Sequence, residues 1–197
     1  MYNLQKTKNM RKLFYASIAL LCMTIVAACG GSGSGSAGGS SESDPMVGKW
    51  QLKKDIEENN GQSMKATWVM DLNADKTMAS NIDVLVEGSQ KGFSMKLPMS
   101  MGFEGTWSTA DDMLTISADS ATTKLNIDKD KVEIKFDDPK LEAMADMMKE
   151  ATFGSISKNM QGNMLNNFIG KDAVRYQVDG SKLLLFTTKD TLVFEKQ

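Results

Sequence analysis

Between Met46 and Glu195 the dominant pattern is a series of segments in which apolar residues recur at every second position, and this period of two limits the possible folds more than any other feature. Successive side chains point to opposite faces of a strand, so the period predicts strands with one apolar and one mostly polar face. The alternation predicts strands over residues 46–53, 64–73, 78–86, 93–107, 114–118, 124–128, 132–136, 174–178, 182–187 and 191–195.

Short turn sequences separate these segments, among them Asn73-Ala74-Asp75-Lys76 and Asp179-Gly180. Strands joined by short turns lie antiparallel beside each other. An open sheet of about ten strands would leave two unpaired edges that attract other chains, and closure removes those edges. We therefore predict an all-β fold, an antiparallel up-and-down β-barrel of about 8–10 strands with a short helical insertion.

The helical insertion is predicted over about residues 138–170. Asp138 can cap a helix and Pro139 can open it. Apolar residues then follow at helical spacing: Leu141, Met144, Ala145 and Met148, and, after Gly154, Ile156, Met160, Met164 and Phe168. We expect these helices to lie over an open end of the barrel, covering or plugging it, or against its wall.

Residues 1–28 have the features of an export signal. Lys6, Lys8, Arg11 and Lys12 precede an apolar run from Leu13 to Ala28. Its sixteen residues are fewer than the roughly 20 that a membrane-spanning helix needs, but they suit a signal-peptide core. The run ends in Val26-Ala27-Ala28-Cys29, which resembles the lipobox of bacterial lipoproteins.

The lipobox resemblance implies that Cys29 becomes the first residue of the mature protein and carries acyl chains such as palmitate. Two or more acyl chains anchor a protein stably without spanning the membrane. The alternative is ordinary secretory cleavage, which would leave Cys29 as a free thiol. We expect a lipid-anchored protein of the bacterial cell envelope, with the membrane as its partner. Gly30 is not an inner-membrane retention residue in these families, which favours the outer membrane.

Residues 29–45 form the predicted lipidated cysteine and linker, and residues 46–197 the barrel domain. The linker is rich in Gly and Ser, and such tracts behave as flexible tethers. The fifteen residues from Gly30 to Asp44 have a typical reach of roughly 20 Å, enough to hold a small domain clear of lipid head groups.

Composition excludes several classes of function. Beyond Cys29 there are 19 basic and 25 acidic residues, a net charge of −6, which argues against nucleic-acid binding. The chain has no histidine, and its two cysteines are Cys22 and Cys29, so histidine-dependent nucleophilic catalysis and zinc sites of His and Cys are excluded. The acid pairs Glu57-Glu58, Asp111-Asp112 and Asp137-Asp138 lie beside predicted turns, where solvation explains them. We expect neither an enzyme nor a cofactor.

Gly48-Lys49-Trp50, at the start of the first predicted strand, resembles the G-x-W opening of lipocalins. Three later blocks, over residues 68–77, 105–116 and 176–183, look like the strand-turn-strand blocks of lipocalin-like lipoproteins from Bacteroidetes-type bacteria. The resemblance covers residues 46–197 except the insertion. It implies that Trp50 closes one end of the core. In lipocalins a late arginine packs on this tryptophan, and Arg175 could do so, although its phase opposes that of its apolar neighbours.

Methionine is unusually frequent, with 16 residues, of which 13 follow Cys29. Seven of these fall on the predicted inward face: Met46, Met64, Met70, Met78, Met95, Met99 and Met101. Flexible thioethers adapt to different guests, which suits a small hydrophobic ligand or lipid. The predicted ligand-binding residues are Trp50, Trp68, Met70, Met95, Met99, Met101 and Phe103. The alternative is a solid barrel core in a structural or protein-interaction module, because side chains often fill small barrels completely.

Three segments carry residue types found in metal sites. The segment from Met95 to Met101 resembles Met-rich Cu(I) sites, but strand alternation explains the same spacing without copper. Oxygen-bearing side chains also recur at two predicted turns, as Asp71, Asn73 and Asp75 and as Asn126, Asp128 and Asp130. Lys76 and Lys131 stand where a calcium loop needs glycine. We therefore predict no metal site.

Overall fold

The computed structural model describes residues 44–58, 61–142, 145, 147, 149–150, 173–187 and 190–197. The predicted signal peptide, the lipidation site Cys29, the tether up to residue 43 and the second part of the helical insertion lie outside the described residues.

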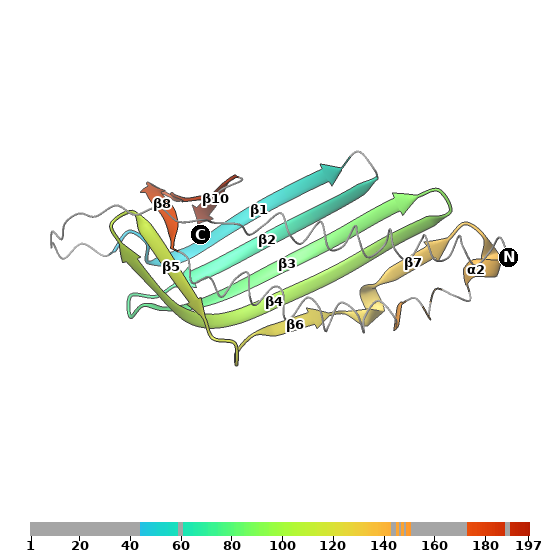
Figure 1. Ribbon diagram of the computed structural model, residues 1–197, viewed down its shortest axis with the longest axis horizontal. Coiled ribbons are helices and arrows are strands. Elements are labelled where there is room, and N and C mark those ends of the chain that lie inside the picture. Colours follow the sequence, from blue (N-terminus) through green and yellow to red (C-terminus); the bar gives the residue numbers. More distant parts are fainter. Residues whose placement is uncertain are drawn as a thin grey trace.

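Ten strands make up most of the described chain (Figure 1). Their bounds are β1 Gly48–Glu58, β2 Gln62–Leu72, β3 Thr77–Gln90, β4 Phe93–Ala110, β5 Met113–Ala118, β6 Lys124–Ile127, β7 Glu133–Phe136, β8 Val174–Asp179, β9 Lys182–Phe186 and β10 Thr191–Lys196. A short 3-10 turn, η1 (Lys129–Lys131), and a helical turn, α2 (Pro139–Glu142), complete the described elements. Each predicted strand segment matches one observed strand, so the all-β prediction is confirmed.

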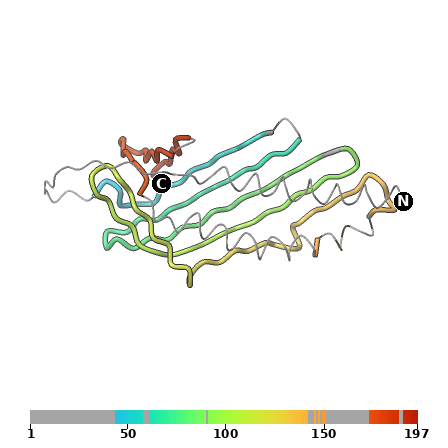
Figure 2. The backbone as a smooth tube through the Cα atoms, viewed as in Figure 1, coloured from blue at the N-terminus to red at the C-terminus, as the bar shows by residue number. Residues whose placement is uncertain are grey.

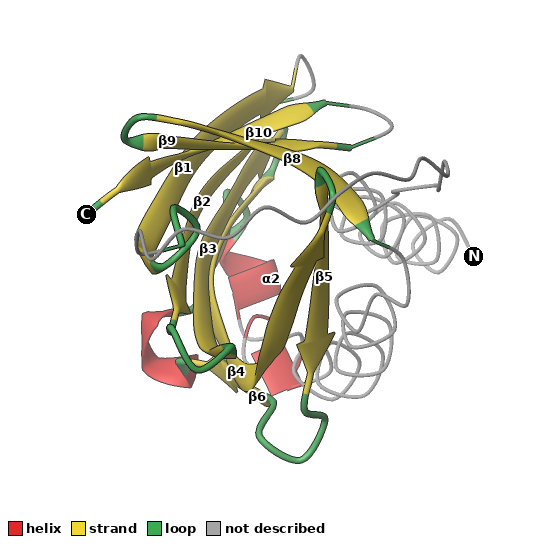
Figure 3. Cartoon of the chain, turned by 90° about the vertical axis from the view of Figure 1, so that its left-hand side faces the viewer, coloured by secondary structure: helices red, strands yellow, loops and turns green. Residues whose placement is uncertain are grey.

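Eight of the strands close into an antiparallel barrel in the order β1-β2-β3-β4-β5-β8-β9-β10, seen end-on in Figure 3. The closing ladder between β1 and β10 is short and pairs Trp50 with Lys196 and Gln51 with Glu195. β6 and β7 pair with β4 along the part of its edge that β5 leaves free. The predicted up-and-down barrel is confirmed, and the eight-strand closure is compatible with a lipocalin-like fold.

The strands differ greatly in length, and this difference shapes the molecule. β1 and β2 have 11 residues, β3 has 14 and β4 has 18, whereas β5, β8, β9 and β10 have five or six. The long strands therefore continue past the closed part, which we call the ring, as a four-stranded projecting sheet extended by β6 and β7 (Figures 1 and 2).

The predicted turns hold their strands with local hydrogen bonds. At the β2–β3 turn the Lys76 N–H donates to the Asn73 carbonyl at 3.0 Å, and Lys76 has a φ of 68°. The Asp75 carboxylate accepts from the Thr77 N–H at 3.0 Å, a local bond typical of aspartate in turns. This carboxylate serves the turn.

The start of the helical insertion matches the prediction. Asp138 Oδ1 accepts from the Lys140 N–H at 3.0 Å, and α2 begins at Pro139. Farther along, Ala145 is buried and belongs to one apolar cluster with inward side chains of β2, β3, β4 and β7. This part of the insertion therefore lies against the inward face of the projecting sheet; residues 151–172 lie outside the described residues.

Candidate functional site

The inward side chains of β1–β4 line up in rows that cross the sheet. The register gives six rows in this phase. The four central rows, read from β1 to β4, are Trp50–Met70–Ser80–Phe103, Leu52–Trp68–Ile82–Met101, Lys54–Ala66–Val84–Met99 and Ile56–Met64–Val86–Leu97, and they lie between Gly48–Leu72–Met78–Gly105 and Glu58–Gln62–Gly88–Met95. The first central row lies at the closing ladder of the ring and the last central row lies in the projecting sheet. Among the sixteen positions of the central rows Lys54 carries the one formal charge.

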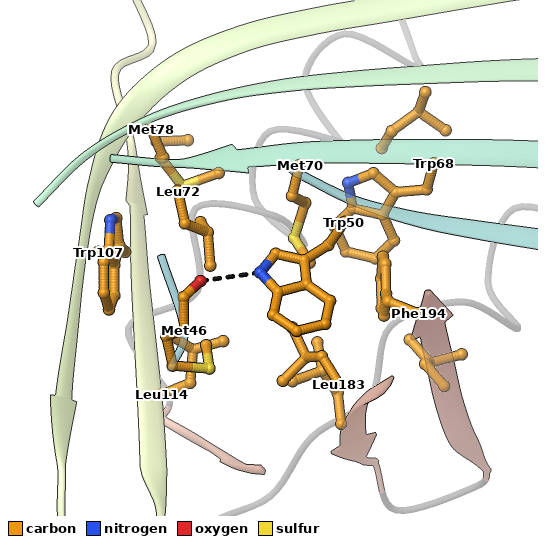
Figure 4. Close-up of a cluster of buried hydrophobic side chains, with 14 of the residues drawn as sticks. Met46, Trp50, Trp68, Met70, Leu72, Met78, Trp107, Leu114, Leu183 and Phe194 are labelled. Carbon is orange, nitrogen blue, oxygen red and sulfur yellow. Dashed lines mark hydrogen bonds between the residues drawn. The ribbon is translucent and has the colours of Figure 1, made fainter. Parts of the chain in front are cut away.

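The ring holds a large buried cluster, drawn in Figure 4, that we call the ring cluster. Trp50 is completely buried and its Nε1 donates to the Met46 carbonyl at 2.8 Å. Trp68 donates from Nε1 to Ser80 Oγ at 2.8 Å, and its ring meets that of Phe194 edge-on, with centroids 5.2 Å apart. The polar atoms of both tryptophans are thus satisfied inside an otherwise apolar core.

A second buried cluster, the distal cluster, covers the projecting sheet. Its buried members are Met64, Val86, Met95, Leu97, Met99, Val132, Ile134 and Ala145. Six half-buried apolar side chains pack against it: Ile56, Val84, Phe93, Leu125, Ile127 and Phe136. This cluster is rich in methionine and lies beyond the point where β1 and β10 pair.

All seven predicted ligand-binding residues are buried on the predicted inward face. Five belong to the ring cluster: Trp50, Trp68, Met70, Met101 and Phe103. The other two, Met95 and Met99, belong to the distal cluster. Val84 and Leu125 pack against both clusters, so the two form one continuous apolar face. The seven methionines predicted to point inward are also all buried.

The cation beside Trp50 is Lys196 and not Arg175, which corrects the role suggested for the arginine. Lys196 Nζ lies 5.2 Å from the centre of a Trp50 ring, because the two residues are register partners in the closing ladder. Arg175 points outward on β8, where it pairs with Asp112 at 2.7 Å and lies over Phe186. Gly48 has a φ of 139°, and a Cβ there would approach Lys196 Cε to 2.7 Å. The glycine of the G-x-W motif therefore leaves room for this lysine.

A second lysine–tryptophan contact lies where the tether enters the barrel. Lys76 Nζ lies 3.7 Å from the centre of a Trp107 ring and 2.6 Å from a carboxylate oxygen of Asp44. Burial alone would raise the pKa of Asp44, but hydrogen bonds from Lys76 and from the Met46 N–H outweigh it and lower this pKa below its usual value. The first described residue of the tether is thus held against the barrel.

Lys54 is the feature of the inward face that sequence reasoning missed. It forms an ion pair with Asp190, the residue before β10. The hydrogen bond from Lys54, together with one from the Thr191 N–H, lowers the pKa of Asp190. The predicted first strand ended at Lys53, whereas β1 continues to Glu58. Extending the alternation by one step would have placed a lysine among the inward residues.

A broad groove of about 1040 Å³ lies on the opposite, outward face of the projecting sheet. Its lining includes short or apolar side chains, Thr67, Leu85, Pro98 and Ser100, and charged residues of both signs. The hollow follows from short outward residues flanked by long ones. The outward phase of the sequence contains that signal, whereas the predicted site residues all come from the inward phase.

Two of the three acid pairs near turns have structural partners. Asp112 pairs with Arg175, and Asp137 accepts a hydrogen bond from the Gly92 N–H at 3.0 Å. Within the described part of the chain, no group of three or more acidic or cysteine side chains could hold a metal ion.

Comparisons with known proteins give no relative: no family model matches the chain, and no curated protein sequence matches it. Of the helices that the structure describes, none has the length and apolar composition needed to cross a membrane.

Proposed function

We propose that this chain is a lipid-anchored lipoprotein of the bacterial cell envelope, on the outer membrane, whose lipocalin-like barrel binds a small hydrophobic molecule or lipid without catalysing a reaction. One observation carries the proposal. The inward apolar face does not end where the ring closes but continues across the projecting sheet as the distal cluster.

The distal cluster has the properties expected of a surface that receives an apolar guest. Closing the ring requires the ring cluster, whereas the distal cluster lies beyond the two residue pairs that join β1 to β10. Its half-buried rim would lose further contact with water on binding, which favours association. Met64, Met95 and Met99 can repack around guests of different shape because the thioether side chain is unbranched.

The expected affinity is modest. A guest with about 20 apolar atoms, each contributing about 0.3 kcal/mol, gains about 6 kcal/mol, which corresponds to a dissociation constant in the tens of micromolar. Binding assays should therefore cover that concentration range.

Native mass spectrometry of the full chain, purified from bacterial membranes into amphipol, tests the proposal. We expect an apolar guest to remain bound to the wild-type chain. Met99→Gln, which places an amide on the inward face at nearly the same side-chain length, should reduce the retained guest. Ser100→Gln, the next residue on the outward face, is the matched control and should retain it. Failure of the wild-type chain to retain any guest, or equal loss in both variants, would count against ligand binding.

The anchor has its own test. Radiolabelled palmitate fed to the producing cells should label the wild-type chain and not Cys29→Ser, and the label should follow the outer-membrane fraction. A labelled Cys29→Ser variant, or an unlabelled wild-type chain, would contradict lipidation at this residue.

A second candidate function is a protein-interaction module with a solid core. It is supported by Met147, a large apolar side chain that is 67% exposed in the segment after α2. Under this alternative, a cross-linker placed in the helical insertion should capture a protein partner with the wild-type chain, and Met147→Lys should abolish that capture. Mass spectrometry should then find no apolar guest in the wild-type chain.

A further inference from the structure

We infer that the barrel selects amphiphiles with an anionic head group, and that Lys54 is the residue that binds this head group. The inference rests on the proposed function, because it assigns the class of ligand that the inward face takes. It is carried by the position of the Lys54 ammonium among the apolar side chains of its own row and of the two rows beside it.

Lys54 lies within the apolar face and not at its margin along the strand. It shares a cross-strand row with Ala66, Val84 and Met99, and its inward neighbours on β1 are Leu52 and Ile56. Its side chain is 34% exposed, so the ammonium keeps some contact with water. An alkyl chain lying along the row toward Met99 would bring a head group at its end to this ammonium.

Lys54 also stands where the ring opens. β10 pairs with β1 at Trp50 and Gln51, and the described ladder goes no farther along β1. The Lys54 ammonium spans the resulting gap to reach Asp190. A head group at this position could face water while its chain remains on the distal cluster, which is the arrangement an amphiphile requires.

The carboxylate of Asp190 occupies the position that a ligand head group would take. Its side chain is 54% exposed and also accepts a hydrogen bond from the Thr191 N–H at 2.8 Å, so it keeps a partner when Lys54 leaves. Exposed ion pairs are weak, and a ligand carboxylate would make the same charge-assisted bond to Lys54 while its alkyl chain adds apolar contact. A ligand carboxylate can therefore replace Asp190 on the lysine.

A purely structural role for Lys54 makes a different prediction. If the ion pair only tied β1 to β10, loss of either partner would have the same effect on the protein. If Lys54 binds the head group, loss of Lys54 weakens anion binding, whereas loss of the Asp190 charge removes a competitor and strengthens it.

The test uses the full chain in amphipol and two probes that share one alkyl chain, laurate and dodecanol, each displacing a neutral naphthylamine dye. We expect the wild-type chain to prefer laurate over dodecanol by about five- to ten-fold, the strength of a partly exposed charge-assisted contact. Lys54→Met should abolish the preference, and Asp190→Asn should raise laurate affinity by about two-fold. Lys53→Met, the outward neighbour, should behave as the wild type. Urea unfolding of each variant checks that it is folded.

The outcomes separate this inference from the proposed function. Equal displacement by both probes in the wild type would overturn the choice of an anionic ligand and leave hydrophobic binding standing. A dye that neither binds nor is displaced would overturn both. A parallel loss of laurate binding in Lys54→Met and Asp190→Asn would overturn the head-group role and assign the ion pair to the structure alone.

Discussion

Replacement of Gly105 by alanine should disrupt the junction at which β5 joins the ring. Gly105 lies on β4 opposite Ala118, at the end of the β4–β5 ladder. A Cβ on Gly105 would stand 2.1 Å from the Ser117 carbonyl oxygen and 2.9 Å from the Ala118 Cα. These atoms belong to the backbone of β5, so no side-chain rotation can relieve the overlap.

The cost follows from the movement that the methyl group requires. Ordinary contact begins at 3.4 Å, so the strands must separate by more than 1 Å at this point. The neighbouring hydrogen bond from the Asp119 N–H to the Glu104 carbonyl, 2.8 Å long, would be lost. Overpacking costs about 1–3 kcal/mol and a lost hydrogen bond about 1 kcal/mol, so we expect destabilisation of about 3 kcal/mol.

Urea unfolding of the full chain, followed by tryptophan fluorescence, measures this cost. Gly102→Ala is the matched control on the same strand, because its Cβ would meet nothing closer than 3.7 Å. We expect Gly102→Ala to stay within about 0.5 kcal/mol of the wild type. A Gly105→Ala variant within about 1 kcal/mol of the wild type would refute the reasoning, because the β4–β5 contact would then not be as close as described.

Three further predictions concern polar contacts. Ser80→Ala should lower the free energy of unfolding by about 1–3 kcal/mol, because Trp68 Nε1 loses its buried acceptor. In a Trp68→Phe background the same substitution should be almost neutral, and equal costs in both backgrounds would contradict this. Asp190→Asn should lower the urea midpoint of unfolding at pH 7 but not at pH 2.5. A carboxylate whose pKa is lowered in the folded state stabilises the fold above its unfolded pKa of about 3.9, and this effect is lost as the pH falls through the folded pKa. A difference in midpoint that persists at pH 2.5 would rule this out. Lys76→Met should raise the pKa of Asp44, as measured by NMR titration, and an unchanged value would show that the lysine contact does not hold that pKa down.

Much of the fold could be predicted because strand alternation is a local property. Whether a residue such as Met99 points inward depends on its neighbours along the chain, and all seven methionines assigned in this way are buried. The Asp138 cap and the turn at Asn73 are equally local, since each uses hydrogen bonds within a few residues.

The parts that could not be predicted depend on contacts between distant segments. Lys196 rather than Arg175 meets Trp50 because β10 pairs with β1 in one particular register. The Lys54–Asp190 ion pair forms for the same reason, across 136 positions of sequence. Nor does the alternation reveal that β6 and β7 extend the sheet from β4 without entering the ring.

The amino-acid sequence by itself determined which side chains face inward, where the chain turns and that the strands are antiparallel, because these depend on side-chain alternation and short-range hydrogen bonding. Only the tertiary structure decided how far the ring closes, which strands project beyond it and which charges meet across the opening. Those features depend on strand register and strand length together, and a pattern with a period of two is the same for every register shifted by two residues.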